Sequence, residues 1–556
     1  MEGLHETEID GVRCFWADSH RPTLSATLLF RQGMADEPFV ESGWLHLLEH
    51  LCLHGHGGGV LEVNGSVSIL ETSFDSHGPP ELVRGELEKV CGWLATPHFT
   101  ELEREKNVLR AEARLRTGPV LRALNWRYGA QGPGLADWRE PGLSLATPES
   151  LRTRTARVFS TQNAVLCLNG PPPTNLRLPL REGPYLDAPT ARPCETGPAM
   201  YVDESGLVLS GLVERSEAAT WAPEVIQRSL VELFRQELGG SYAPYSQYTR
   251  VDARTAVIVA GCDVLPEVLP HLAERALDLV ARMKSWPVPT TWLEEIRASR
   301  LQHLADPQAE GAQAWRAGGA AILGEEPDDL ARVIELTRTV GNDAVWQEVS
   351  RFCDSLLLGL PGESAWANQL PRVEFPEGES TTEGTKHRSV NWPADQSELG
   401  VAADRVTIST RSSTIEVRIP EVVGMFAYQD GGRHLISSAG WTMPVEPTKW
   451  QRGAALVPRL DELVPAHLHL PQGERPAPEF AKWSFAARWW GYVKNKRILG
   501  SLVIGVPILA AAGLYYLWSG GSPDRVQQND LQGLGGVVVL VVTAILIFSA
   551  KSGNKT

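Results

Sequence analysis

A pair of histidines four residues apart constrains this chain more than any other feature. His46 and His50 enclose Glu49 in the segment HLLEH. On an α-helix, positions three and four residues apart share one face, so both imidazoles and the carboxylate would project together. Imidazole nitrogens are good Zn²⁺ ligands, and a carboxylate beside the metal can accept a proton from a bound water. The segment therefore predicts a helix that carries a zinc site.

The flanking sequence supports this helix and offers a third ligand. Ser42 and the following glycine can begin the helix, and the glycine-rich segment 55–59 can end it. A catalytic zinc takes a third protein ligand and keeps one position open. The charged stretch 101–114 predicts a second helix, on which Glu105 and Glu112 share a face two turns apart. Either carboxylate is a candidate for the third ligand.

These motifs together resemble the pitrilysin/insulinase family of zinc metallopeptidases, in which an inverted H-x-x-E-H motif precedes an E-x6-E pair. The resemblance implies three zinc ligands, namely His46, His50 and Glu112. It makes Glu49 the general base and places Glu105 behind a ligand, outside the coordination sphere. It also implies that the substrates are unfolded peptides.

Two details near the motif depart from the family pattern. The family has an Asn-Ala pair on the edge strand that receives the substrate backbone. Alignment on Thr72 puts Ile69-Leu70 at that place, in a predicted strand over 66–70, and leaves the substrate groove open to question. His54 and His56 add two imidazoles near the site. They are expected to be loop residues, because the three-ligand set is complete without them.

The chain is too long for one hydrophobic core, so several domains are expected. The zinc-peptidase domain is predicted over residues 1–190. The proline-rich segment 171–193 predicts a linker at its end. Residues 197–375 repeat the first domain in outline but contain no second H-x-x-E-H. The resemblance implies an α+β fold in which two duplicated insulinase-type domains form a half-shell.

The second domain contains an arginine and a tyrosine that resemble a substrate-binding pair of the family. Arg235 and Tyr242 flank the turn at Gly239-Gly240. A helix end with a glycine cap explains the same local pattern. In the family two half-shells enclose the peptide, which implies a homodimer or a heterodimer with a related half-shell.

The sequence changes character after residue 375. The polar segment 376–396 predicts disorder. Residues 397–466 predict a small β-domain, because apolar and polar residues alternate strictly over 414–419. This domain resembles the pleckstrin-homology type, and a plain spacer or docking module is the alternative.

Two uncharged stretches near the end, 499–518 and 533–550, are long enough to span a bilayer. They predict a transmembrane hairpin over 499–550. Lys and Arg residues flank the hairpin at both ends and are scarce in its loop, which predicts that both ends are cytoplasmic. The N-terminus lacks the basic and apolar regions of a signal peptide. A membrane protein with a cytoplasmic catalytic region is therefore expected.

Composition excludes one class of partner. The net charge of −15 argues against nucleic acid binding. The seven cysteines form no C-x-x-C pair and are expected to be reduced thiols. The predicted function is a zinc endopeptidase that hydrolyses unfolded peptides at the membrane face. Two alternatives remain open, a non-catalytic membrane-tethered peptide-binding scaffold or partner subunit, and a maturation protease for one peptide precursor.

Overall fold

The structure is a computed structural model that describes most of the chain up to residue 488. The described residues are 3–237, 239, 243–362, 370–378, 384–476, 478, 480, 483, 484 and 486–488. They divide into two compact units. The first comprises residues 1–376, 417–445 and 458–475, and the second comprises 377–416, 446–457 and the residues from 476 onward.

The first unit begins with a mixed six-stranded sheet in the order β1-β2-β6-β3-β5-β4. Its strands are β1 His5–Ile9, β2 Val12–Trp16, β3 Leu24–Phe30, β4 Glu62–Val67, β5 Thr72–Gly78 and β6 Ala164–Leu168. Its helices are α1 Trp44–Leu53, α2 Pro80–Ala95, α3 Leu102–Leu115, α4 Pro119–Tyr128 and α5 Pro148–Val158. Strand β4 is an edge strand, and α1 packs beside it.

A second sheet repeats the topology of the first. Its order is β7-β11-β8-β10-β9. The strands are β7 Ala199–Val202, β8 Leu207–Glu214, β9 Tyr245–Arg250, β10 Thr255–Cys262 and β11 Leu357–Leu360. The one parallel pairing, β7 with β11, corresponds to β2 with β6 in the first sheet. Helix α6 Ala222–Leu230 lies between β8 and β9, as α1 lies between β3 and β4. The matching order confirms the predicted α+β fold with an internal duplication.

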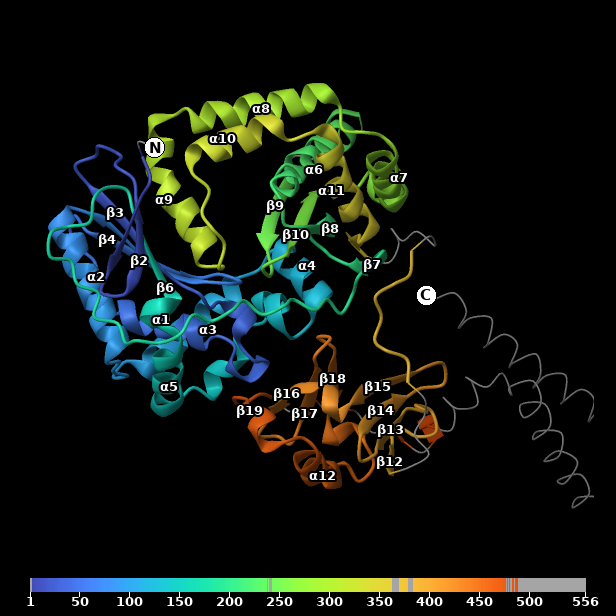
Figure 1. The fold of residues 1–556 in the computed structure, drawn as a ribbon. Coiled ribbons are helices and arrows are strands. Elements are labelled where there is room, and N and C mark those ends of the chain that lie inside the picture. The colour runs from blue at the N-terminus through green and yellow to red at the C-terminus, as the bar shows by residue number, and fades with distance from the viewer. Residues whose placement is uncertain are drawn as a thin grey trace, which may run out of the picture. The chain divides into compact units, whose positions relative to one another are not determined.

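The remaining helices of this half lie between β10 and β11. They are α7 Leu272–Ser285, α8 Thr290–Leu304, α9 Pro307–Ala321, α10 Leu330–Thr339 and α11 Asn342–Asp354. The two halves exchange one helix each. Helix α9 packs on β2 and β6 of the first sheet, whereas α4 packs on β8, β10 and β11 of the second (Figure 1). Gly318 permits the close approach of α9, because a methyl group there would overlap the sulfur of Cys167 on β6.

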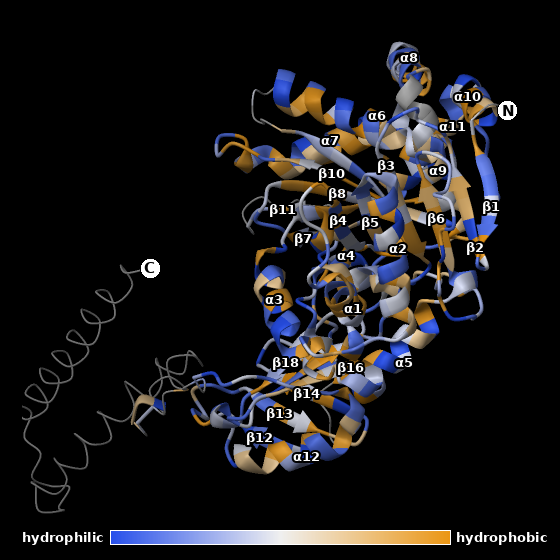
Figure 2. Cartoon of the chain, turned by 90° about the vertical axis from the view of Figure 1, so that its left-hand side faces the viewer, coloured by the Kyte–Doolittle hydropathy of each residue, from blue (hydrophilic) through white to orange (hydrophobic). Residues whose placement is uncertain are grey.

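Hydropathy follows position in the sheet (Figure 2). Strand β6, with sequence AVLCL, is buried at every position, whereas the edge strand β1, with sequence HETEI, is largely exposed. Because both faces of β6 are covered, its side chains are apolar at every position and not only at alternate ones.

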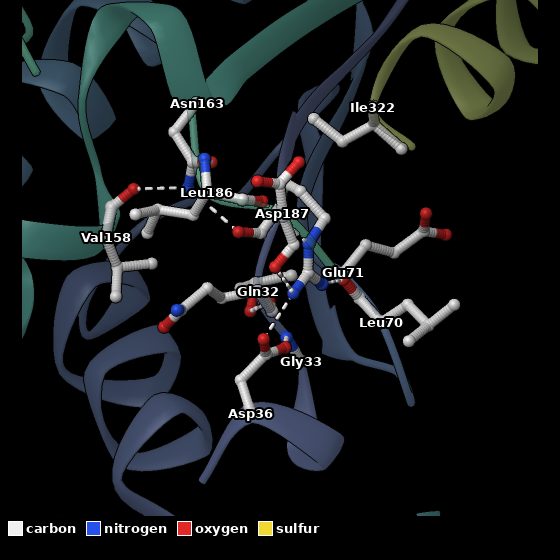
Figure 3. Close-up of polar contacts among 12 residues, drawn as sticks. Gln32, Gly33, Asp36, Leu70, Glu71, Val158, Asn163, Leu186, Asp187 and Ile322 are labelled. Carbon is white, nitrogen blue, oxygen red and sulfur yellow. Dashed lines mark hydrogen bonds and ion pairs between the residues drawn. The ribbon is translucent and has the colours of Figure 1, made fainter. Parts of the chain in front are cut away.

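A fully buried arginine fixes the connections around β3. Arg31 donates hydrogen bonds to the carbonyl oxygens of Leu70, Leu186 and Asp187 and pairs with Asp36 (Figure 3). The guanidinium thereby joins the turn after β4 and the segment that leads to the second half. Burial is tolerated because the charge of Arg31 is paired and its donors are satisfied.

A third sheet also belongs to the first unit. Its order is β18-β17-β16-β19, formed by β16 Val422–Ala427, β17 Arg433–Ser437, β18 Thr442–Val445 and β19 His469–Pro471. Ile436 and Leu470 share an apolar cluster with Phe39 and Leu135 of the first half. The backbone N–H of Ala130 donates to the carbonyl of Ser438 at 2.9 Å. Helix α12 Leu456–Leu463 precedes β19.

The second unit contains a sheet in the order β12-β13-β14-β15. Its strands are β12 Thr385–Arg388, β13 Glu398–Val401, β14 Arg405–Ser409 and β15 Thr414–Arg418. The prediction of disorder over 376–396 is wrong for 385–388. These residues pair with β13 in register, and polar side chains suit the exposed edge that β12 forms. The β-rich region thus begins earlier than the predicted range 397–466.

The predicted transmembrane hairpin, 499–550, lies outside the described residues. Among the residues that the structure does describe, no helix combines the length and the apolar composition that a bilayer span needs.

Candidate metal centre

Helix α1 is built to present one polar face from an otherwise buried helix. Its apolar residues pack into the core of the first half, including Leu45, Leu48 and Leu51. Its N-terminus is held by Glu37, whose carboxylate accepts hydrogen bonds from the backbone N–H groups of Gly43 and Leu45, each at 2.8 Å. A carboxylate at this end also interacts favourably with the helix dipole.

The polar face of α1 brings together the three residues of the H-x-x-E-H motif. Ligand atoms of His46, Glu49 and His50 lie within 4.8 Å of one another. Glu49 Oε2 is 3.9 Å from His46 Nε2 and 3.8 Å from His50 Nε2. From α3, Glu112 Oε2 approaches His50 Nε2 to 3.6 Å. Two imidazole nitrogens and the Glu49 carboxylate thus form a group that can hold a divalent metal, and the half-exposed Glu112 lies beside His50.

The opposite nitrogen of each imidazole contacts a carboxylate. Glu105 Oε2 lies 3.3 Å from His50 Nδ1, and Glu140 Oε1 lies 2.7 Å from His46 Nδ1. A carboxylate at Nδ1 favours a proton on that nitrogen and leaves the lone pair of Nε2 directed toward the centre. This chemistry fits a zinc ion held by both histidines.

Glu140 has no counterpart among the residues predicted from the sequence. Burial raises its pKa, but the hydrogen bond with His46 and the charges of His46 and Arg116 outweigh burial and lower it overall. Glu140 has a positive φ of 50°. Its side chain passes directly over Gly43, where a Cβ would lie 2.6 Å from the Cβ of Glu140. No periodic pattern in the sequence connects Glu140 to α1. The available signals were Gly43 and the Pro141-Gly142 turn next to Glu140, which indicate that two backbone segments lie close together.

Glu49 is more buried than either histidine beside it. Its side chain is 7% exposed. Burial raises its pKa to about 7; His50 opposes this shift, and the negative charge of Glu112 adds to it. A carboxyl group with such a pKa can exchange protons near neutral pH.

The structure corrects the expectation for the edge strand. Ile69-Leu70 do not lie on a strand, because the turn between β4 and β5 closes with Ser68 and Glu71 and buries both apolar side chains. Asn64 and Gly65 lie on the edge strand β4. Gly65 lies against the motif helix, since a methyl group there would overlap the carboxylate of Glu49.

The two additional histidines lie beyond the end of α1, as expected. His54 Nδ1 contacts Glu105 Oε1 at 2.9 Å, so Glu105 bridges His50 and His54. His56 Nδ1 contacts Glu86 at 2.5 Å. Among the described residues, the potential metal-binding group consists of His46, Glu49 and His50, so it contains neither of these histidines, and Glu112 as third ligand stays a prediction.

Of the second predicted pair, only Arg235 belongs to the described residues. Arg235 is exposed on the π-helical segment η7 Val231–Glu237, which continues α6 in the second half. Tyr242 lies outside the described residues. Their proposed contact with a substrate stays a prediction.

Comparisons with known proteins agree on the fold. No protein-family profile matches the sequence, and no curated protein matches it. A protease from Helicobacter pylori is similar at a TM-score of 0.52 and 13% identity, over 65% of this chain and 100% of that one. The periplasmic protease PqqL from Escherichia coli is similar at 0.51 and 13%, over 75% of this chain and 56% of that one.

An inactive peptidase M16 domain from Pseudomonas fluorescens is similar to the same degree, with a TM-score of 0.51, 14% identity and coverage of 65% and 98%. At these identities the likeness establishes an M16-type fold and nothing more. Because both proteases and an inactive domain share it, function must be argued from the side chains of this chain.

Proposed function

We propose that the protein is a zinc-dependent endopeptidase that hydrolyses unfolded peptides. One observation carries the proposal. The Nε2 atoms of His46 and His50 lie on either side of Glu49, Glu112 approaches His50 Nε2 to 3.6 Å, and carboxylates engage both Nδ1 atoms. A purely structural cluster has no need to aim two imidazole lone pairs at one point.

In this proposal His46, His50 and Glu112 hold the zinc, and Glu105 orients His50. The bound ion would polarise the scissile carbonyl and lower the pKa of a water. Glu49 accepts a proton from the attacking water and delivers it to the leaving amine.

Strand β4 supplies a place for the substrate backbone. It is the edge of the first sheet, and its Gly65 lies directly against Glu49. An extended peptide that pairs with such an edge gains main-chain hydrogen bonds without a fixed sequence. We limit the proposal to unfolded peptides, because an extended segment with no structure of its own leaves its backbone N–H and C=O groups available for pairing with this edge.

The variant Glu49→Gln tests the proposal. We expect the full chain with this change to retain zinc but to lose nearly all peptide hydrolysis, because an amide cannot shuttle the proton. Zinc is measured by metal analysis and turnover with internally quenched peptides. Glu103→Gln, on the exposed side of α3, is the matched control. Near-normal turnover by Glu49→Gln would contradict the assigned base.

The alternative is a scaffold that binds peptides without cleaving them, as an inactive domain of this fold could do. Wild-type protein that binds peptide and zinc yet cleaves nothing would favour it. A maturation protease would instead cleave only one precursor within a broad peptide panel.

The proposal also includes a second half-shell and a membrane anchor, both inferred from the sequence. Activity restored by mixing Glu49→Gln with Arg235→Ala chains would support a dimer in which Arg235 and Tyr242 serve the partner's zinc. Labelling of a cysteine at Ser522, but not at Ser552, with an impermeant reagent on intact cells would support a hairpin whose catalytic region is cytoplasmic.

A further inference from the structure

The two faces of β4 differ in what they offer a paired peptide. Gly65 faces α1 and Glu49. Because side chains alternate along a strand, Asn64 and Ser66 face the opposite way, and both are exposed. Ser66 Oγ lies 3.0 Å from Ser73 Oγ on β5, which confirms that these residues share a face. A paired peptide would place alternate side chains over this second face.

A carboxylate lies on this face one strand behind the edge. Asp75 on β5 pairs with Asn64 of β4 and with Thr27 of β3. The hydroxyl of Thr27 donates to Asp75 Oδ1 at 2.5 Å, and the hydroxyl of Ser73 donates to Oδ2 at 3.0 Å. Trp315 Nε1 fixes Thr27 in turn by donating to its hydroxyl at 2.7 Å. The carboxylate is therefore held in place by neutral donors.

No cation of the described residues forms an ion pair with Asp75. Strands β3, β4 and β5 contain no Lys or Arg, and His77, which shares this face of β5 and lies opposite Glu62, bonds to the hydroxyl of Ser25 at 2.8 Å. The same face carries a second acidic group, the exposed Glu62 of β4. A half-buried, preorganised carboxylate beside an open edge strand is suited to receive a cation from a ligand.

We infer that Asp75, supported by Glu62, is a specificity-determining residue that selects a lysine or arginine in the bound peptide. The inference rests on the proposed function. The selected residue pairs with Asn64 and is the neighbour of the residue that pairs with Gly65 and faces Glu49. The basic residue therefore lies within one position of the cleaved bond.

Reach explains why the selected side chain must be long. Neighbouring strands are about 4.8 Å apart, so a peptide side chain must cross β4 to meet a carboxylate on β5. Lysine and arginine have stems that can lie over Asn64 while the cationic group contacts Asp75. Shorter polar side chains end above β4.

Paired peptides test this inference on the full-length protein. The peptides differ only in one residue, lysine or norleucine, which has a similar length without the charge, and this residue is moved stepwise along the sequence. We expect wild-type protein to cleave within one position of lysine, with kcat/KM roughly tenfold above that for norleucine. Mass spectrometry of the products locates the cleaved bond.

Three variants of Asp75 sharpen the test. Asp75→Asn should bring the lysine-to-norleucine ratio close to one, Asp75→Glu should retain a preference for lysine, and Asp75→Lys should shift the preference toward a glutamate peptide. Asp278→Asn, an exposed aspartate on α7, is the control and should keep the wild-type ratio. Glu62→Gln offers an independent, surface-exposed test that should lower the ratio by a smaller factor. A wild-type ratio near one, or an unchanged ratio in Asp75→Asn, would overturn the inference.

Binding separates this inference from the proposed function. Fluorescence anisotropy with full-length Glu49→Gln protein should show tighter binding of the lysine peptide than of the norleucine peptide. If wild-type protein cleaves nothing while this preference persists, the peptidase proposal fails and the subsite stands. Cleavage without any preference for lysine overturns the subsite alone.

Discussion

Glu140 links both helices of the candidate metal centre although it lies on neither of them. Its Oε1 atom contacts His46 Nδ1 at 2.7 Å and Arg116 Nη2 at 2.6 Å. His46 lies on α1, and Arg116 caps the C-terminus of α3, the helix that carries Glu105 and Glu112. A partner of this kind sets the orientation of a ligand and the spacing between helices before metal arrives.

We therefore expect Glu140→Gln to weaken zinc binding. The amide retains size but loses the negative charge that fixes His46 and Arg116, and zinc should be released roughly ten- to a hundredfold faster. Chelator competition measures the release rate without reference to activity. Glu103→Gln again serves as the control. Release at the wild-type rate from a folded Glu140→Gln protein would show that His46 needs no such partner.

At the scale of the element, the N-terminus of α1 depends on one buried acid. Burial raises the pKa of Glu37 to about 7, and the backbone hydrogen bonds from Leu45 and Gly43 only partly oppose this effect. The folded protein thus holds the proton more tightly than the unfolded chain, whose glutamates titrate near 4.3. Stability from this group is complete below about pH 4 and is lost as pH rises toward 7.

Denaturant titrations at several pH values test this linkage. Between about pH 4.5 and 7 the wild-type free energy of unfolding should fall, relative to Glu37→Gln, by up to roughly 3 kcal/mol, because each unit of pKa shift is worth about 1.4 kcal/mol. Glu149→Gln, an exposed acid in the first turn of α5, is the control. A difference between wild type and Glu37→Gln that does not change with pH would mean that Glu37 is ionised in the folded protein throughout this range.

Elements in which functional or apolar residues recur with helical spacing could be predicted from the sequence. The exact positions of the strands and the contacts between distant segments could not. Helix α1 and the face shared by Glu105 and Glu112 follow from spacing alone. The strand over 66–70 was misplaced, because Ile69 and Leu70 are apolar for a different reason, namely that their turn is buried against Gly33. Glu140 escaped prediction because a contact across 94 residues leaves no local pattern.

At the scale of the whole molecule, the exchanged helices make the two halves depend on each other. Helix α9 supplies Ala314, Ala317 and Ala321 to an apolar cluster that contains Phe15, Leu29 and Val165 of the first sheet. Helix α4 returns Ala123 and Leu124 to the same cluster, beside Val257 and Val259 of the second sheet. The hydrophobic effect thus acts across the boundary that the sequence suggested near residue 190.

A truncated chain of residues 1–190 should therefore fail to form a native domain, although it contains every residue of the candidate centre. Without α9, one face of β2 and β6 loses its cover, and exposed apolar faces of this kind promote aggregation. We expect this fragment to bind a hydrophobic dye and to lack a near-ultraviolet circular dichroism signal. A chain that ends at Arg475 retains the first two sheets and both exchanged helices. It should be well ordered and form a single species, either a monomer or a dimer. A cooperative, soluble 1–190 fragment that binds zinc as tightly as the longer chain would show that the exchange of α4 and α9 contributes little to stability, and that the first half is an independent domain.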